Sequence, residues 1–230
     1  MTQACRGDLA PTAPQAVRDA FASLAPPLRN PVSQACLDAI ADPARTMLGA
    51  RQYAVLTRAI ARSTATWKVV VNEVPIQQYY ALPYDRWEGY ENERQKVLSA
   101  LKGMPNTVFI TTDVHATLAN DARLRTLGPG GPENSGILDV TVGPAATANF
   151  ALEIDDAVGI PGAGNLVDNL FFEPQPPSGI GMQCSVMDQF SYGAVEVTSS
   201  QLTITPKGID GAPLTSSDGP CGPFVLNYQP

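Results

Sequence analysis

The chain contains an Asp-x-His motif directly after a stretch with the composition of a buried strand. The motif is Asp113-Val114-His115, and His115 is the only histidine among the 230 residues. One carboxylate and one imidazole nitrogen form a donor pair that suits iron, zinc or manganese and, through the carboxylate, calcium. A structural alternative stays open, in which the aspartate caps a following helix and the histidine lies in its first turn. Asp113 and His115 are therefore candidate metal ligands and candidate catalytic residues.

A second polar pair, Asn72 and Glu73, follows an earlier apolar run. That run, residues 67–71, is β-branched at successive positions, as expected of a buried strand. An amide and a carboxylate at the end of such a strand are unfavourable if they are left unpaired and unsolvated. Their position favours a role in the same site as the Asp-x-His motif.

The elements between the two pairs predict how the pairs are positioned. Residues 90–101 have the apolar spacing of a helix that stops before Gly103, and residues 106–112 form a second buried run. Strand, helix and strand make one βαβ unit with parallel strands. Because the carboxyl ends of parallel strands meet at one edge, we expect Asn72, Asp113 and His115 to lie together there.

The rest of the chain predicts further helices and an antiparallel hairpin. Helical spacing is expected at about 15–25, 33–40, 51–60, 116–127, 145–158 and 163–171. A strand is expected at 137–142, and residues 192–197 and 201–205 alternate in the manner of a hairpin. The predicted class is α/β, with a parallel βαβ unit and a C-terminal antiparallel hairpin.

Composition and charge exclude several function classes. The chain has 44% hydrophobic residues, and no apolar run approaches the roughly 20 residues that span a bilayer. A formal net charge of -7 disfavours binding to a nucleic-acid backbone. An anionic substrate would therefore need a metal ion or local cations. The first residues show no secretion signal.

The four cysteines favour disulfides over a zinc site. Cys5, Cys36, Cys184 and Cys221 lack C-x-x-C spacing, and a single histidine excludes a zinc knuckle. Two local disulfides, Cys5 with Cys36 and Cys184 with Cys221, are one reading, and buried free thiols are the other. We predict that Cys184 and Cys221 pair, because the hairpin between them reverses the chain and the turn at 220–223 is stiff.

The residues resemble the alkaline phosphatase D, or PhoD-like, metallophosphatases in several blocks whose order and spacing match. The blocks are residues 42–49 with Gln52, 67–72, 85–90 with Glu93 and Arg94, 111–115, 181–184, 189–192 and 220–224. This coverage divides the chain into a Pro/Ala-rich flank or insertion at 1–40 and the C-terminal part of a PhoD-like domain at 41–230.

The resemblance implies a function, a fold and roles for individual residues. Such proteins hydrolyse phosphomonoesters and phosphodiesters at a site of calcium and iron ions, in a layered αββα fold, and are usually exported. Metal binding then carries over to Asp113 and His115, and a ligand or phosphate contact to Asn72. Substrate-binding or site-shaping roles are expected for Glu73, Asp85, Trp87 and Tyr90.

The family's earlier motifs are missing from the matching part of the chain. A metal-binding cysteine, a Gly-Asp followed by a tyrosine, and an Asp-His pair should precede Ala41, and residues 1–40 contain no convincing equivalent. We therefore expect an N-terminally incomplete hydrolase whose activity is weak on its own. The alternative is a catalytically inactive binding or structural remnant of the fold.

Overall fold

The computed structural model describes residues 15, 19, 22–23, 32–79, 86–126, 132–169 and 180–230. Asp85 and Cys5 lie outside these residues, as does most of the helix expected at 15–25. Five strands form the larger sheet in the order β1-β2-β4-β3-β5. They are β1 (Lys68–Val71), β2 (Thr107–Thr111), β3 (Thr117–Leu124), β4 (Glu133–Thr141) and β5 (Met182–Val186).

Strand β1 pairs with β2, and β2 with β4, in parallel, whereas β3 is antiparallel to both β4 and β5. The predicted parallel βαβ unit is thus confirmed. Its crossover contains the 3-10 turn η2 (Trp87–Gly89) and helix α4 (Glu91–Leu101).

A smaller antiparallel sheet packs against one face of the larger one. It has the order β10-β7-β6, with β6 (Ser191–Val197), β7 (Gln201–Gly208) and β10 (Phe224–Asn227). The predicted C-terminal hairpin is therefore confirmed as β6 and β7. A two-stranded ribbon, β8 (Thr215–Ser216) and β9 (Gly219–Pro220), precedes β10.

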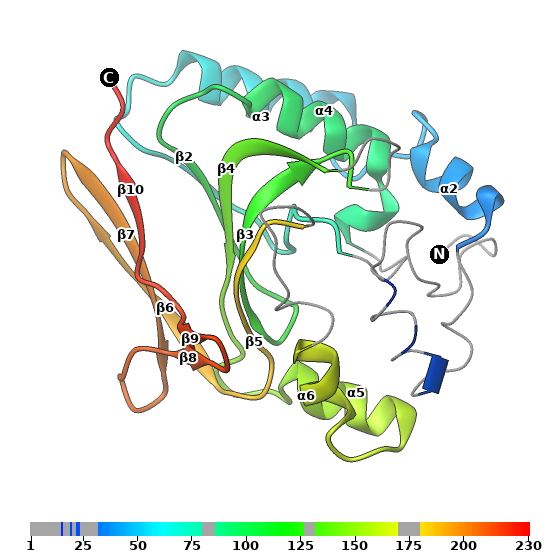
Figure 1. Ribbon diagram of the computed structural model, residues 1–230. Coiled ribbons are helices and arrows are strands. Elements are labelled where there is room, and N and C mark those ends of the chain that lie inside the picture. Colours follow the sequence, from blue (N-terminus) through cyan, green and yellow to red (C-terminus); the bar gives the residue numbers. More distant parts are fainter. Residues whose placement is uncertain are drawn as a thin grey trace.

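Helices cover the opposite face of the larger sheet and one end of the molecule. Helices α3 (Gly49–Arg62) and α4 lie over the sheet (Figure 1), and α2 (Gln34–Ala41) lies beside them. Helices α5 (Phe150–Val158) and α6 (Ala163–Val167) lie together at the end near β5 (Figure 1). Among the described helices, none is long and apolar enough to cross a membrane.

Three groups of buried side chains hold these layers together. One lies between α3, α4 and the larger sheet and includes Trp87, Leu98 and Phe109. Another fills the space between the two sheets, where Leu202 and Ile204 of β7 meet residues of β2, β3, β4 and β5. The third joins α2, α5 and α6 to the chain around Val114. The architecture is a mixed α/β sandwich, in agreement with the predicted class.

The segment after His115 was predicted to be a helix, and this prediction is wrong. Residues 117–124 form β3, which lies between β4 and β5. Burial on both faces removes the polar and apolar alternation typical of a strand, so its apolar residues also fit helical spacing. Pairing with two neighbouring strands overrides that local preference. Strand β5 was not predicted at all.

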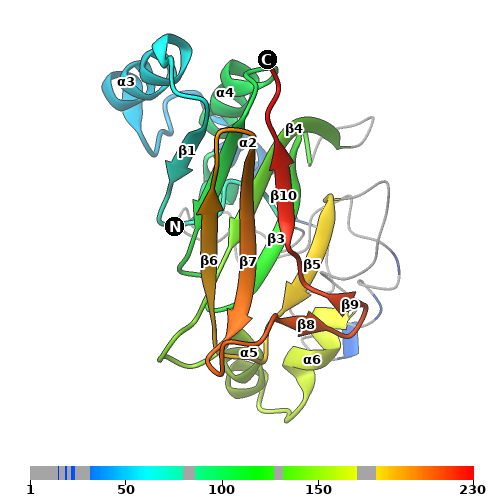
Figure 2. The same ribbon diagram turned by 90° about the vertical axis from the view of Figure 1, so that its left-hand side faces the viewer.

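Strand β1 was expected to be buried, but it is the edge strand of its sheet. Val69 is 40% exposed and Val71 81% exposed, although Val70 packs against the helices. The edge strand β6 of the smaller sheet also leaves Val195 and Val197 exposed. Trp67, which precedes β1, donates from Nε1 to the carbonyl of Thr198 after β6 at 2.7 Å. The edge strands β1 and β6 therefore lie on the same flank of the sandwich, as Figure 2 shows.

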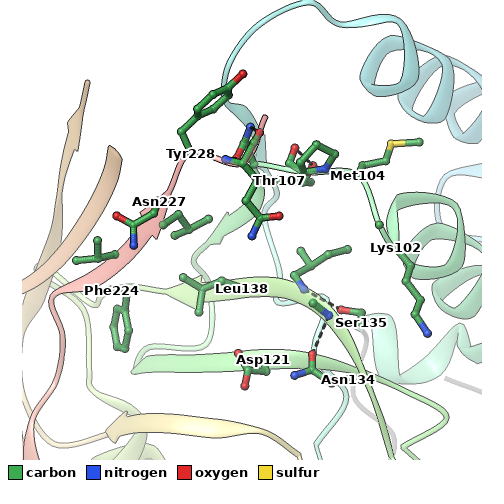
Figure 3. A pocket seen from close by; sticks show the side chains of 18 of the residues that line it. Lys102, Met104, Thr107, Asp121, Asn134, Ser135, Leu138, Phe224, Asn227 and Tyr228 are labelled. Carbon is green, nitrogen blue, oxygen red and sulfur yellow. Dashed lines mark hydrogen bonds between the residues drawn. The ribbon is translucent and has the colours of Figure 1, made fainter. Parts of the chain in front are cut away.

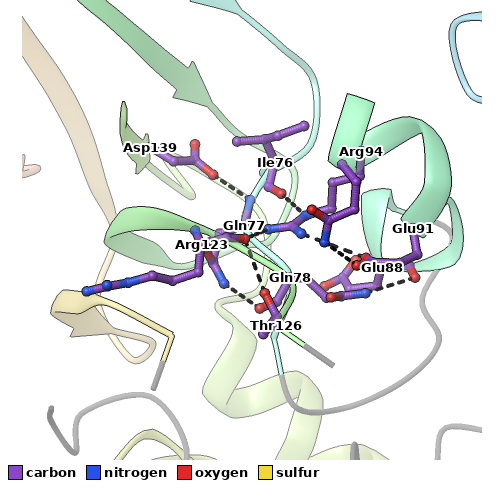
Figure 4. A network of polar contacts seen from close by, with 10 residues as sticks. Ile76, Gln77, Gln78, Glu88, Glu91, Arg94, Arg123, Thr126 and Asp139 are labelled. Carbon is purple, nitrogen blue, oxygen red and sulfur yellow. Dashed lines mark hydrogen bonds and ion pairs between the residues drawn. The ribbon is translucent and has the colours of Figure 1, made fainter. Parts of the chain in front are cut away.

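A buried polar network ties α4 to the loop after β1 (Figure 4). Arg94 is fully buried and donates to the carbonyls of Ile76 at 2.6 Å and Arg123 at 2.5 Å. The backbone N–H of Gln77 donates to Asp139 Oδ2 at 2.9 Å. The loop that follows Asn72 and Glu73 is thus held by side chains from two different elements, α4 and β4.

Candidate functional site

The two candidate segments meet at the carboxyl edge of β1 and β2. The backbone N–H and the hydroxyl of Thr112 both donate to the carbonyl of Glu73, at 3.2 and 3.1 Å. The N–H of Asn72 donates to the carbonyl of Ile110 at 3.1 Å. These contacts bring the residues before Asp113 next to the chain that carries Asn72 and Glu73.

The polar side chains at this edge differ in their exposure to solvent. Glu73 and Asp113 are exposed to solvent. Asn72 is half-buried, and its Nδ2 donates to the carbonyl of Val74 at 2.6 Å. Three oxygen-bearing side chains therefore lie on neighbouring segments of the same edge.

The Asp-x-His loop has an unusual backbone conformation. Asp113 has φ +69° and His115 has φ +58°, a left-handed region that non-glycine residues seldom adopt. Val114 between them is 4% exposed and packs in the core with Ala116 and Leu118. Val114 anchors this loop in the core between two residues in the seldom-adopted conformation, and backbone strain of this kind is concentrated at functional sites.

His115 contacts a residue that the sequence did not single out. Its Nδ1 lies 2.5 Å from Oε1 of Glu153, in the first turn of α5. The carbonyl of His115 also accepts a hydrogen bond from the N–H of Phe150 at 2.9 Å. An acidic residue in the first turn of a helix is common for electrostatic reasons, so its sequence position alone could not have revealed this pair.

Trp87 and Tyr90, which were expected to shape the site, contact other parts of the protein. Trp87 is 2% exposed within the core under α3 and α4, and its Nε1 has no hydrogen-bond partner among the described residues. The ring of Tyr90 lies below the guanidinium of Arg45, 4.5 Å from ring centre to Cζ. An apolar groove of about 700 Å³ between α3 and β1 is lined by both Trp87 and Asn72.

A larger cavity lies elsewhere among the described residues. It measures about 910 Å³ and is lined by the turn before β2, by β4 and by β10 (Figure 3). This is the amino end of β2, opposite the edge that carries Asp113. Two of its polar side chains are already engaged, because Lys102 pairs with Glu133 and Gln183 donates to Asp121 at 2.7 Å. The cavity is therefore distinct from the candidate site.

The candidate site has the donor types of a metal centre but not a full set of ligands. Carboxylate, amide and imidazole groups suit calcium and iron. In the described part of the chain, however, no group of three His, Cys, Asp or Glu side chains comes together to hold a metal ion. The described residues alone do not complete such a centre.

The fold and the loop define a mixed α/β sandwich with a candidate site at the carboxyl edge of its parallel strands. The family model for PhoD-like phosphatase matches residues 14–165, and the chain belongs to this family. It is 31% identical over 91 residues to alkaline phosphatase D of Bacillus subtilis (strain 168), a match that covers 35% of this chain and 15% of that protein.

A solved structure, "Structure of PhoD", has the same fold. It superposes with a TM-score of 0.52 over 83% of this chain at 18% identity. The superposition covers 34% of that chain. The present chain therefore spans about a third of the length of this relative.

Proposed function

We propose that this chain is part of a metal-dependent phosphate-ester hydrolase of the alkaline phosphatase D type, which acts on phosphomonoesters or phosphodiesters. Membership of the PhoD-like phosphatase family supports the reaction class. The observation that carries the proposal is the strained Asp113-Val114-His115 loop at the carboxyl edge of the parallel strands. In open α/β sheets, this edge is where ligands bind.

The proposed cofactors are calcium and iron. Asp113, His115 and the amide oxygen of Asn72 would hold one side of the metal centre, with Glu73 nearby in a substrate-binding or site-shaping role. Bound cations of this kind neutralise phosphate charge and lower the pKa of a coordinated water. Calcium takes six to eight oxygen ligands, so these three side chains need further ligands, and the missing family motifs are their proposed source.

The flank formed by β1 and β6 supports the proposal that the active unit includes further chain. Edge strands of stable sheets are usually protected by charges, prolines or bulges. Here β1 instead presents Val69 and Val71, next to the apolar groove along α3. Coverage of only 34% of the PhoD structure agrees with a fold that continues beyond this edge. We propose that the present chain is N-terminally incomplete as an enzyme.

Export is proposed as well. The disulfide between Cys184 and Cys221 supports it, because disulfides persist mainly in oxidising compartments.

The proposal is tested by hydrolysis of a chromogenic phosphodiester by a longer version of the protein that includes the missing family motifs. His115→Ala and Asp113→Ala are each expected to abolish most activity while the melting temperature stays near that of the parent. Asp156→Ala, an exposed change on α5, is the matched control and should leave turnover unchanged. Full activity in both site variants would remove Asp113 and His115 from the site, whereas no turnover in the parent itself would favour the alternative of an inactive remnant.

A further inference from the structure

We propose that Glu153 is a positioning residue for His115, which holds the imidazole as the Nδ1–H tautomer and leaves the Nε2 lone pair free to act in the site. The role of His115 in the site rests on the proposed function, whereas the tautomer does not.

The contact itself defines the donor and the acceptor. An ionised carboxylate can only accept hydrogen bonds, so at 2.5 Å from Glu153 Oε1 the Nδ1 atom of His115 must carry the hydrogen. A neutral imidazole has one N–H, and Nε2 is then an acceptor. The tautomer of a histidine is commonly set in this way by the hydrogen bond that its other nitrogen makes.

Both partners are held by the surrounding structure. Strained backbone and the buried Val114 fix the histidine. The helix that carries Glu153 is capped by Asn149, whose Oδ1 accepts from the N–H of Leu152 at 3.0 Å. The Nδ2 of Asn149 donates to the carbonyl of Asp188 at 2.9 Å, which ties the start of α5 to the chain after β5.

The helix is also packed too closely to rotate. A Cβ atom at Gly164 of α6 would overlap the backbone of Ala151, so the two helices approach each other backbone to backbone. The N–H of Ala151 donates to the carbonyl of Met187 at 3.0 Å. Glu153 therefore projects from a rigid helix, although its side chain remains 41% exposed and that of His115 31% exposed. Glu153 therefore acts on His115 by orienting its imidazole ring and by setting its tautomer.

The single histidine makes the proposal directly measurable in the 230-residue protein. Nitrogen NMR of isotope-labelled protein, at a pH where the imidazole is neutral, reports which ring nitrogen carries the hydrogen. We expect Nδ1–H in the parent and in Glu153→Gln, whose side-chain oxygen can still accept. In Glu153→Ala we expect a shift toward the Nε2–H form, and in Asp156→Ala no change.

An Nε2–H tautomer in the parent, or an unchanged tautomer in Glu153→Ala, overturns the proposal. If Glu153→Ala does not fold, Glu153→Asp, which is one methylene shorter, provides the same comparison.

The catalytic consequence is measured separately in the longer protein. Loss of groups that orient a functional histidine typically lowers activity or metal affinity by about 10 to 100-fold. Glu153→Ala should fall in this range and Glu153→Gln should recover most of the loss, with kcat affected more than KM. If the parent has the Nδ1–H tautomer but no version of the longer protein is active, the proposed function is contradicted and the positioning role stays intact. Equal activity of Glu153→Ala and the parent would contradict the positioning role.

Discussion

Cys184 and Cys221 form a disulfide that joins the two sheets of the sandwich. Cys184 lies on β5 of the larger sheet, Cys221 precedes β10 of the smaller one, and their Cα atoms are 5.3 Å apart. Both side chains are buried in the core between the sheets. The predicted pairing is confirmed. Cys36 is also disulfide-bonded, whereas Cys5 lies outside the described residues.

Removal of the disulfide at Cys184 and Cys221 should destabilise the protein substantially. The cross-link closes a loop with a sequence separation of 37, for which chain entropy predicts a stabilisation of about 4 kcal/mol. Cys184→Ser with Cys221→Ser should lower the free energy of unfolding in urea by about 2 to 4 kcal/mol. A difference below about 0.5 kcal/mol would show that packing alone holds the two sheets together.

Replacement of Glu93 should unfold the start of α3. Its carboxylate accepts hydrogen bonds from the N–H groups of Met47, Leu48 and Gly49 at 2.6, 2.8 and 3.0 Å. Glu93→Ala leaves these donors without their acceptor and should lower stability by about 2 to 3 kcal/mol. Glu93→Gln keeps one oxygen acceptor and should lose less. Glu196→Ala, on the exposed side of β6, is the control, and an equal effect of both alanine variants would contradict the capping role.

Ionisation of Asp139 should make the stability depend on pH. Burial raises the pKa of this carboxyl to about 6, against the lowering effect of hydrogen bonds from Gln77 and Thr111. Because the folded-state pKa lies above the unfolded value of about 4, protonation favours the folded state. This contribution is complete below about pH 4 and is lost as the pH rises through about 6.

The corresponding loss of stability is on the order of 3 kcal/mol, at about 1.4 kcal/mol for each pH unit of pKa shift. Asp139→Asn should flatten the pH dependence of the free energy of unfolding between about pH 4 and pH 6. An unchanged slope in Asp139→Asn would show that other groups cause it.

A charge on the exposed edge strand β1 should affect the stability of the 230-residue protein and of the longer protein differently. Val71 is 81% exposed in this chain, so Val71→Lys should change its stability by less than about 0.5 kcal/mol. If further chain covers this edge in the longer protein, the same change buries a charge there and should be strongly destabilising. Val225→Lys on β10 is the control. A small effect of Val71→Lys in both proteins would show that the edge stays free.

The sequence predicted the elements whose signal is local. The apolar runs at β1 and β2, the helix between them and the alternating hairpin of β6 and β7 were all found, because each carries its own periodicity. The prediction failed at β3, where burial on both faces removed the alternation. The burial predicted for β1 was also wrong, because exposure of an edge strand depends on which strands pair beyond it.

The candidate site was predictable only in part. The spacing of Asn72 and the Asp-x-His motif indicated one edge, and the backbone contacts between Glu73 and Thr112 bring these segments together. Glu153 lies 38 residues after His115 in the chain, so only the tertiary structure could reveal their contact. The roles proposed for Asp113, His115 and Asn72 remain predictions.

The central claim is tested most directly by metal content and phosphodiester turnover in two lengths of the protein. Among the described residues, Asp113, His115 and Asn72 are the proposed ligands, and three side chains are too few for a centre of calcium and iron. We predict that it binds these metals poorly and turns over far more slowly than a longer version that includes the missing family motifs. Full metal loading and equal turnover in the 230-residue chain would contradict the account, because all of the ligands would then lie within it.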